Sequence, residues 1–274
     1  MSRTSRVAVV GLVGKTVFME VPRFHAGGET IHARDLHEEW GGKGFNQAVA
    51  AARQGAEVAF LGAVRTCDVE PLRAFCARER VTGVIVGTEE PTAFASILTD
   101  GTGETRVTVY PGGKLGPADV DGFEPAIAAA DFLLLNNEVP EEVNLRAAEI
   151  AERRSVRIVF NPAPARPLPE ALKRAAFLFT PNEFEAAGLG DVPCEVVTTL
   201  GAKGCRIRST GETIPAVSVG KAVDSTGAGD TFNAVLAVRL AEGASLREAC
   251  REANAAAARS VTVRYVLPSL PSRC

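Results

Sequence analysis

Short apolar runs alternate with amphipathic stretches along most of the chain, and this pattern narrows the folds open to it. The apolar runs have the length of buried strands and lie at Val7–Val10, Val58–Leu61, Phe132–Leu135, Arg157–Phe160 and Phe177–Thr180. Helical spacing of apolar residues marks the stretches between them, such as Asn46–Arg53, Ala118–Ala129, Glu141–Arg153 and Thr231–Glu242. Strands that alternate with helices form a mainly parallel sheet covered on both faces. The sequence therefore predicts an α/β fold, and with no long linker or repeat we expect residues 1–274 to form one domain.

Two regions break this alternation. Thr92–Thr99 and Glu104–Tyr110 alternate apolar and polar residues around a Gly-containing turn at residues 100–103, which is typical of a β-hairpin. Phe18–Trp40 lacks helical periodicity and is expected to be extended. An antiparallel patch beside a parallel sheet can form a lid over a ligand cleft. It can also be a surface hairpin without a function, and the pattern alone leaves both interpretations open.

Charge and cysteine spacing argue against several classes of protein. The net charge is −3 and the basic residues are scattered, so we expect no nucleic-acid partner. The apolar run Val7–Val13 is too short to span a bilayer, and we expect no membrane partner. None of the cysteines forms a C-x-x-C pair, which argues against a zinc site or a disulfide framework and favours the reducing cytoplasm.

A Gly-rich segment, Asp224–Phe232, precedes a long Ala-rich helical stretch. Small residues let the backbone approach a bound group, and the first turn of a helix offers unpaired N–H groups with partial positive charge. This combination suits a transferring phosphate. Asp230, within the segment, could accept the proton of an attacking hydroxyl. Alternatively, Asp230 is a helix-terminal acid that the helix dipole favours, and Gly229 serves only the turn.

A second glycine cluster, Gly41–Asn46, leads into another helical stretch. Its glycines, Lys43 and Asn46 could hydrogen-bond the hydroxyls of a polar ligand, although the cluster taken alone favours a plain turn. Gly11–Thr16 ends in Gly-Lys-Thr and suggests a P-loop, but the motif requires glycine where this chain has Val9, and no helical pattern follows. A P-loop NTPase is therefore a weak alternative.

The two glycine clusters together resemble the two signatures of the PfkB carbohydrate kinase family, in particular its ribokinase-like members. Between them lie three segments that fall in the order found in the family: Asn161–Arg166, Thr180–Glu185 and Thr199–Gly204. The resemblance implies a ribokinase-like three-layer αβα sandwich with a mainly parallel central sheet and a small β-sheet lid. We expect the lid at roughly residues 12–40 and 92–110.

The resemblance also implies a role for particular residues. Asp230 would be the catalytic base, and the backbone N–H groups of Gly227, Ala228 and Gly229 would form an anion hole for the phosphoryl group. The sugar would face Gly42, Lys43, Asn46 and Glu138. ATP would lie against Asn182, Thr199, Gly201, Gly204 and Asn254. Glu185 would organise Mg²⁺ through water, while Asp224 and the carbonyl of Thr226 would correspond to a monovalent cation site, which K⁺ could occupy.

The chain departs from the family on the sugar and cation sides. Members usually carry an Asp, and often an Asn, after the first strand, at positions that correspond here to Thr16 and Gly14. Loss of this carboxylate should weaken the binding of a ribose-like sugar. The usual Gly-Asp-Asp or Gly-Asn-Asp turn is replaced by Arg65–Asp68, and Tyr265 stands where a glycine is typical. A changed substrate explains this distribution better than general decay.

The sequence supports two classes of function. The first is an enzyme that transfers the γ-phosphate of MgATP to a hydroxyl of a small sugar, with a nucleoside or ketohexose kinase as a variant. The second is a degenerate member that binds sugar or nucleotide as a sensor. The altered sugar side motivates the sensor, and the retained Asp230, Asn182 and Glu185 argue against it. Because lid strands in this family sometimes pair between subunits, a homodimer is a further expectation.

Overall fold

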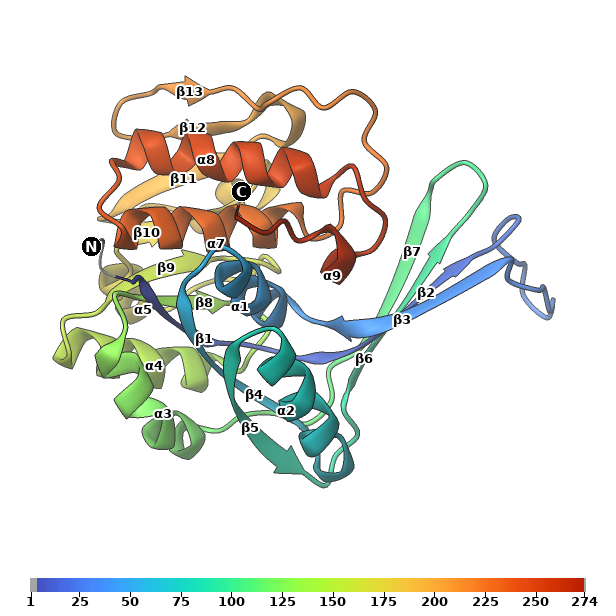
Figure 1. The fold of residues 1–274 in the computed structure, drawn as a ribbon, viewed down its shortest axis with the longest axis horizontal. Coiled ribbons are helices and arrows are strands. Elements are labelled where there is room, and N and C mark those ends of the chain that lie inside the picture. The colour runs from blue at the N-terminus through green and yellow to red at the C-terminus, as the bar shows by residue number, and fades with distance from the viewer. Residues whose placement is uncertain (1–3, 274) are drawn as a thin grey trace.

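The apolar runs form the central sheet of the computed structural model, which describes residues 4–273 (Figure 1). Within these residues the strand order is β13-β12-β11-β10-β9-β8-β1-β4-β5. The seven neighbouring strands β11, β10, β9, β8, β1, β4 and β5 are parallel to one another. Strands β12 and β13 extend the sheet antiparallel at one edge. Their bounds are β1 Arg6–Val10, β4 Glu57–Arg65, β5 Val81–Thr88, β8 Phe132–Asn136, β9 Arg157–Asn161, β10 Leu178–Phe179, β11 Glu195–Thr199, β12 Cys205–Ile207 and β13 Thr213–Ile214.

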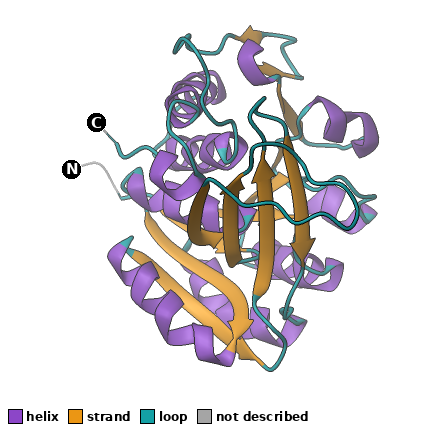
Figure 2. Ribbon diagram, turned by 90° about the vertical axis from the view of Figure 1, so that its right-hand side faces the viewer, coloured by secondary structure: helices purple, strands orange, loops and turns teal. Residues whose placement is uncertain are grey.

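Helices cover both faces of this sheet (Figure 2). One buried cluster joins it to α1 Lys43–Arg53, α2 Val69–Arg78, α7 Ala228–Ala241, α8 Leu246–Ser260 and α9 Val266–Ser269. The other joins it to α3 Pro117–Ala129, α4 Glu141–Arg153, α5 Glu170–Ala175 and α6 Glu183–Leu189. Strand β8 is buried at every position, which explains why it reads as a continuous apolar run. The three layers confirm the predicted fold class. By length and hydropathy, none of the helices within residues 4–273 could cross a bilayer.

A separate small sheet, which we call the lid sheet, projects from the end of the central sheet (Figure 1). Its strand order is β3-β2-β6-β7, with β2 Gly14–Glu20, β3 Asp35–Gly41, β6 Ala93–Thr99 and β7 Thr105–Tyr110. Strands β2 and β6 are parallel, while β3 and β7 pair antiparallel with them. The segment that ends in Gly-Lys-Thr therefore enters a strand instead of a helix, so the P-loop interpretation is wrong.

Tyr265 connects the lid sheet to the body of the protein. Its ring stacks on His37 of β3, with 3.8 Å between ring centroids, and meets Phe18 of β2 edge-on at 5.2 Å. Its hydroxyl donates a hydrogen bond to Oδ2 of Asp35 over 2.8 Å. The adjoining Arg264 forms an ion pair with Glu20 of β2 at 2.9 Å. One short segment before α9 thus holds the edge strand β3 and its neighbour β2.

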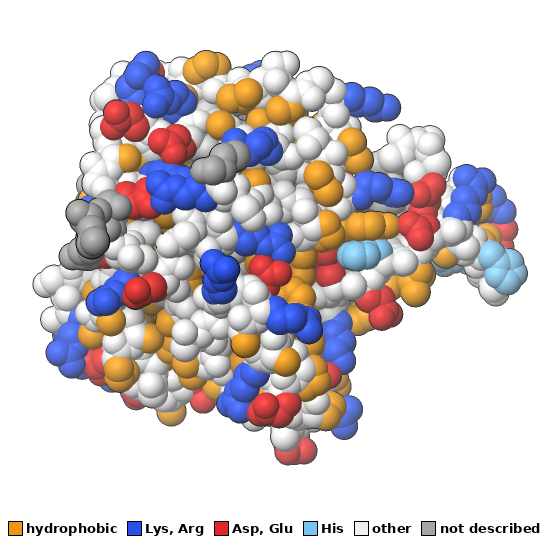
Figure 3. Space-filling view, in the orientation of Figure 1, with side chains coloured by type: hydrophobic (Ala, Val, Ile, Leu, Met, Phe, Trp, Pro, Cys, Tyr) orange, Lys and Arg blue, Asp and Glu red, His pale blue; other side chains and the backbone are white. Residues whose placement is uncertain are grey.

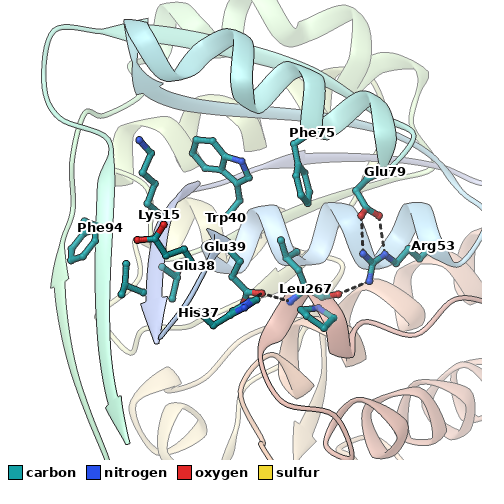
Figure 4. A pocket seen from close by; sticks show the side chains of 13 residues that line it. Lys15, His37, Glu38, Glu39, Trp40, Arg53, Phe75, Glu79, Phe94 and Leu267 are labelled. Carbon is teal, nitrogen blue, oxygen red and sulfur yellow. Dashed lines mark hydrogen bonds and ion pairs between the residues drawn. The ribbon is translucent and has the colours of Figure 1, made fainter. Parts of the chain in front are cut away.

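The backbone of Tyr265 is strained. Its dihedral angles are φ 67° and ψ 163°, a combination that is almost confined to glycine and costs a residue with a side chain about 1–3 kcal/mol. The main chain after it is held by Glu39 of β3, whose carboxylate accepts the N–H groups of Val266 and Leu267 at 2.9 and 3.2 Å. Figure 4 shows the bond to Leu267. These contacts with the lid offset the strain.

Residues 267–273 are fastened to the end of α1. Arg53 donates to the carbonyls of Leu267 and Leu270 at 2.5 and 2.9 Å, and it pairs with Glu79 at 2.8 Å (Figure 4). Gln54 donates to the carbonyl of Pro271 at 2.7 Å. The chain after α9 therefore stabilises the helix that begins in the second glycine cluster.

Replacing Tyr265 with glycine should loosen the lid without unfolding the protein. The variant loses the ring contacts and a hydrogen bond but also loses the backbone strain, so we expect its melting temperature to move by less than about 3 °C. Loss of about 1 kcal/mol of local stability should raise the rate of limited proteolysis in residues 21–34 about fivefold. Tyr110→Ala, at the far edge of the lid sheet, serves as the control. Equal cleavage of Tyr265→Gly and the unmodified protein would contradict this role.

Candidate active site

The Gly-rich segment forms the start of α7, and Asp230 lies inside its first turn. The helix begins at Ala228, three residues before the predicted start, because Gly227 adopts φ +79° and caps it. A Cβ atom at Gly227 would lie 2.5 Å from Cγ1 of Val266, so the position admits only glycine. Open space surrounds the corresponding point at Gly229. Within residues 4–273 the N–H groups of Gly229 and Asp230 have no hydrogen-bond partner, whereas Ala228 donates to the carbonyl of Ser225 at 3.3 Å.

The Asp230 carboxylate is buried and faces two amide groups from α1. Asn46 Nδ2 donates to its Oδ2 at 2.9 Å, and Gln47 Nε2 donates to its Oδ1 at 3.2 Å. Burial raises the pKa of Asp230 above its usual value, and the charge of Lys43 and the two amide bonds act in the opposite direction. Gln47, which is fully buried, is absent from the residues that the sequence indicated.

The second glycine cluster places Lys43 and Glu138 beside this carboxylate. Gly42 has φ +106°, and a Cβ there would lie 2.5 Å from the carbonyl oxygen of Leu12. The Lys43 N–H donates to Glu138 Oε2 at 2.6 Å. The charge of Asp230 is the main cause of a raised pKa at the Lys43 ammonium. Burial raises the pKa of Glu138 to about 7. The structure therefore brings Lys43, Asn46, Glu138 and Asp230 together.

The Asn182–Glu185 pair forms a capping box at the start of α6. Glu185 N–H donates to Asn182 Oδ1 at 2.8 Å, and the Glu185 carboxylate accepts the N–H and the amide of Asn182 at 2.9 and 3.0 Å. The charge of Glu185 also contributes to the raised pKa of Lys43, so α6 begins near the same cleft. Thr199 pairs with Asn182 across the strand ends. The capping bonds leave further lone pairs on both Glu185 oxygens.

The remaining residues of the predicted nucleotide side lie in the edge strands and α8. The turn Gly201–Lys203 begins at Gly201 and is followed by Gly204, and both glycines have positive φ. A side chain at Gly204 would clash with the carbonyl of Ile214. Asn254 is buried, and its amide donates to the carbonyls of Ile214 and Pro215 at 2.9 and 3.3 Å. The contacts of Asn254 hold the end of β13, a structural role that the sequence did not indicate.

On the cation side, the Asp224 carboxylate is held by two backbone groups. Its Oδ1 accepts the N–H of Thr226 at 2.9 Å and its Oδ2 accepts the N–H of Tyr265 at 3.0 Å. The carbonyl of Val261 accepts the N–H groups of Val223 and Asp224 at 2.7 and 3.2 Å. Asp224 therefore links the segment before α7 to the residue that holds the lid.

The altered positions on the sugar side have structural consequences. A Cβ at Gly14 would lie 2.5 Å from the carbonyl oxygen of Ala93 in β6, so the lid sheet leaves no room for an amide side chain. Thr16 is buried. Asp68, the acid of the altered turn, pairs with Lys15 at 2.7 Å and accepts from Thr92 at 2.6 Å. Its carboxylate fastens the lid sheet to the body.

Several cavities border these residues. One of about 330 Å³ is lined by Gly11, Leu12, Glu138 and Arg166, at the carboxyl ends of the central strands. A second of about 330 Å³ is lined by Phe18, Asp224, Thr226 and Tyr265, between lid and body. A larger one of about 600 Å³ lies at the root of the lid and is lined by side chains of Lys15, Trp40, Phe75 and Glu79 (Figure 4). Asp230 and Lys43 line none of the three, and we place the candidate site at the first two, because Glu138 lines one and Asp224 and Thr226 line the other.

Comparison with known proteins gives consistent relatives. A family model described as pfkB family carbohydrate kinase matches residues 4–273. Ribokinase of Haemophilus influenzae is 34% identical over 97% of this chain and 95% of its own length, and ribokinase of Bacillus subtilis is 33% identical over 97% and 96%.

Solved structures show the same fold. Ribokinase from Giardia lamblia superimposes with a TM-score of 0.87 at 28% identity, over 99% of this chain and 97% of its own. Arabidopsis thaliana ribokinase complexed with ribose and ATP has a TM-score of 0.86 at 26% identity, over 98% and 96%. A nucleoside kinase of Methanocaldococcus jannaschii, at 18% identity and a TM-score of 0.82, shares the fold. With the family model matched across all but the ends of the chain, this protein belongs to the pfkB family of carbohydrate kinases.

Proposed function

We propose that this protein is an ATP-dependent sugar kinase in which Asp230 deprotonates the hydroxyl that attacks the γ-phosphorus. The observation that carries this proposal is a buried carboxylate in the first turn of α7, beside Lys43 and beside backbone N–H groups without partners. The raised pKa of Asp230 makes it a stronger base, while Lys43 and the two amides keep it ionised. Phosphoryl transfer needs positioning and charge stabilisation more than covalent chemistry, and this site supplies both.

The anion hole consists of the N–H groups at Gly227, Gly229 and Asp230, with the dipole of α7 behind them. Open space at Gly229 allows a phosphoryl group to approach the backbone. The N–H of Ala228 already donates to Ser225, so its contribution is smaller than the sequence suggested.

On the acceptor side, Gly42, Lys43, Asn46 and Glu138 bind the sugar. The carbonyl oxygen of the Asn46 amide is buried and has no partner within residues 4–273, and Glu138 lines the cavity at the strand ends. Thr16 and Gly14 provide no carboxylate or amide, so we propose a ribose-like acceptor that receives fewer hydrogen bonds from the lid. A nucleoside or a ketohexose is the second candidate acceptor.

The nucleotide lies along Asn182, Thr199, Gly201 and Gly204, on the α6 side of the cleft. Mg²⁺ commonly keeps several waters and is held through one or two carboxylates and the phosphates. Glu185 fits this use, because both of its oxygens keep free lone pairs beside the capping bonds. When bound, the ion would neutralise phosphate charge.

Two further features belong to the proposal. Asp224 and the carbonyl of Thr226 form a K⁺ site that stabilises the segment before α7, and activity should be higher in KCl than in NaCl of equal ionic strength. Leu36, Phe94 and Tyr110 are exposed on one face of the lid sheet, and we propose that a second copy of the chain covers them in a cytoplasmic homodimer. Light scattering coupled to gel filtration measures the dimer.

The substrate panel tests the proposal directly. ADP release should be measured with pentoses, hexoses, sugar acids and nucleosides, each in the presence of MgATP and of either K⁺ or Na⁺. Release with at least one acceptor is the expected result. A ligand that shifts the thermal stability while none of the panel yields ADP would support the sensor and overturn the kinase.

Asp230→Asn isolates the catalytic base. The variant should bind nucleotide and acceptor with dissociation constants near those of the unmodified protein, because its shape is unchanged. Its kcat should fall at least ~10²-fold, the scale that a general base contributes. Calorimetry measures binding and a coupled assay measures kcat. Unchanged kcat would show that another group takes the proton.

Glu138 should make stability depend on pH. Because its pKa is raised from 4.5 to about 7 on folding, its stabilising contribution is complete below about pH 4.5 and is lost as the pH rises through 7. The variant Glu138→Gln does not lose this stabilisation. The difference in free energy of unfolding between the variant and the unmodified protein should therefore increase between pH 5 and pH 8, by up to about 3 kcal/mol in favour of the variant. Denaturant melts measure it, with the exposed Glu142→Gln as control. A difference independent of pH would refute it.

A further inference from the structure

A chain of buried hydrogen bonds leads away from the Asp230 carboxylate. Its first link is Gln47, whose Nε2 lies 3.2 Å from Asp230 Oδ1 and 3.4 Å from Asn161 Oδ1 at the end of β9. Asn161 Nδ2 then donates to the carbonyl of Thr180 at 3.1 Å, just after β10. The chain thus connects α1 to the ends of two central strands.

The chain returns to α7. The Thr180 hydroxyl hydrogen-bonds Asn233 Oδ1, and Asn233 Nδ2 donates to the carbonyl of Gly229 at 2.8 Å. Gly229 directly precedes Asp230, so the bonds form a closed ring from the carboxylate to its own helix turn. The exposed fractions of the linking side chains are 0% for Gln47, 7% for Asn161, 1% for Thr180 and 2% for Asn233. Their burial strengthens each bond and makes a lost partner costly.

Two backbone carbonyls decide the direction of every amide in this ring. The carbonyl of Thr180 can only accept, so Asn161 must turn Nδ2 toward it and Oδ1 toward Gln47. Gln47 must then present its NH₂ group to both Asn161 and Asp230, because the reverse orientation would place Oε1 against two acceptors. Consistent with this, Gln47 Oε1 has no partner within residues 4–273.

We propose that Gln47 is a positioning residue for the catalytic base: its amide, oriented by Asn161 and the Thr180 carbonyl, fixes the rotation of the Asp230 carboxylate relative to the anion hole. This inference rests on the role of Asp230 proposed above. Because Gln47 donates and offers no acceptor to the carboxylate, it also favours the ionised base. The other charged groups that act on Asp230 are Lys43 and Glu138, and both stay in place in the variants below.

Gln47→Met tests the proposal, with Gln54→Met as the matched control. Gln54 is a buried glutamine just after the same helix, and its amide bonds Pro271 and Arg239 instead of the site. We expect Gln47→Met to lose about tenfold in kcat, with KM values for acceptor and MgATP changed less than about threefold. The hydrogen bond from Gln47 lowers the pKa of Asp230, so its loss should raise that pKa. The acidic limb of the kcat–pH profile of Gln47→Met should therefore move to higher pH. Gln54→Met should keep the limb unchanged.

Gln47→Glu tests the orientation of the Gln47 amide, and it is the second test of the proposal if Gln47→Met does not fold. A carboxylate there would face the acceptor oxygens of Asp230 and Asn161, so kcat should fall more than in Gln47→Met, and the deficit should shrink as the pH falls. A Gln47 variant with the kcat and pH profile of the unmodified protein would overturn the inference. If Asp230→Asn is inactive in that case, the proposed base stands; if Asp230→Asn is active, the base assignment itself fails.

Discussion

A buried carboxylate persists in its ionised form only where donors and a positive charge compensate it. For Asp230 the compensation comes from one helix, since Lys43, Asn46 and Gln47 all lie in the first turns of α1. The start of that helix is set by tight backbone contact: a Cβ at Gly44 would lie 2.6 Å from the Cα of Gly11 at the end of β1. The electrostatics of the site thus depend on how closely α1 packs against the first strand.

Much of the fold follows from pattern, because strands covered on both faces must be apolar throughout. The five apolar runs correspond to β1, β4, β8, β9 and β10, although β10 is shorter than its run. The lid strands were visible as alternation around a turn. Helix starts were less accurate: Gly227 ends the preceding turn through its positive φ, and α7 consequently begins within the Gly-rich segment, at Ala228.

The candidate site was only partly visible. Family motifs indicated Lys43, Asn46 and Asp230, but Gln47 was missed, because a glutamine in a helix is usually exposed and its partner lies 183 residues away. The pattern N-x-x-E at Asn182 had two meanings, a phosphate-side pair and a capping box, and local sequence does not separate them.

On the face shown in Figure 3 basic and acidic side chains intermingle, as the scattered charges suggested.

The attachment of residues 267–273 to Arg53 and Gln54 bears on how the protein is made. A ribosome produces α1 well before these partners. Until then the two polar side chains at the end of α1 face no carbonyls, and Asp230 on α7 has itself only just been synthesised. The lid sheet also lacks a contact at this stage, because Tyr265, which hydrogen-bonds Asp35 of β3, has not yet been synthesised. Translation can build the β1-to-β5 half of the sheet progressively, but the candidate site is complete only after α7 has been synthesised.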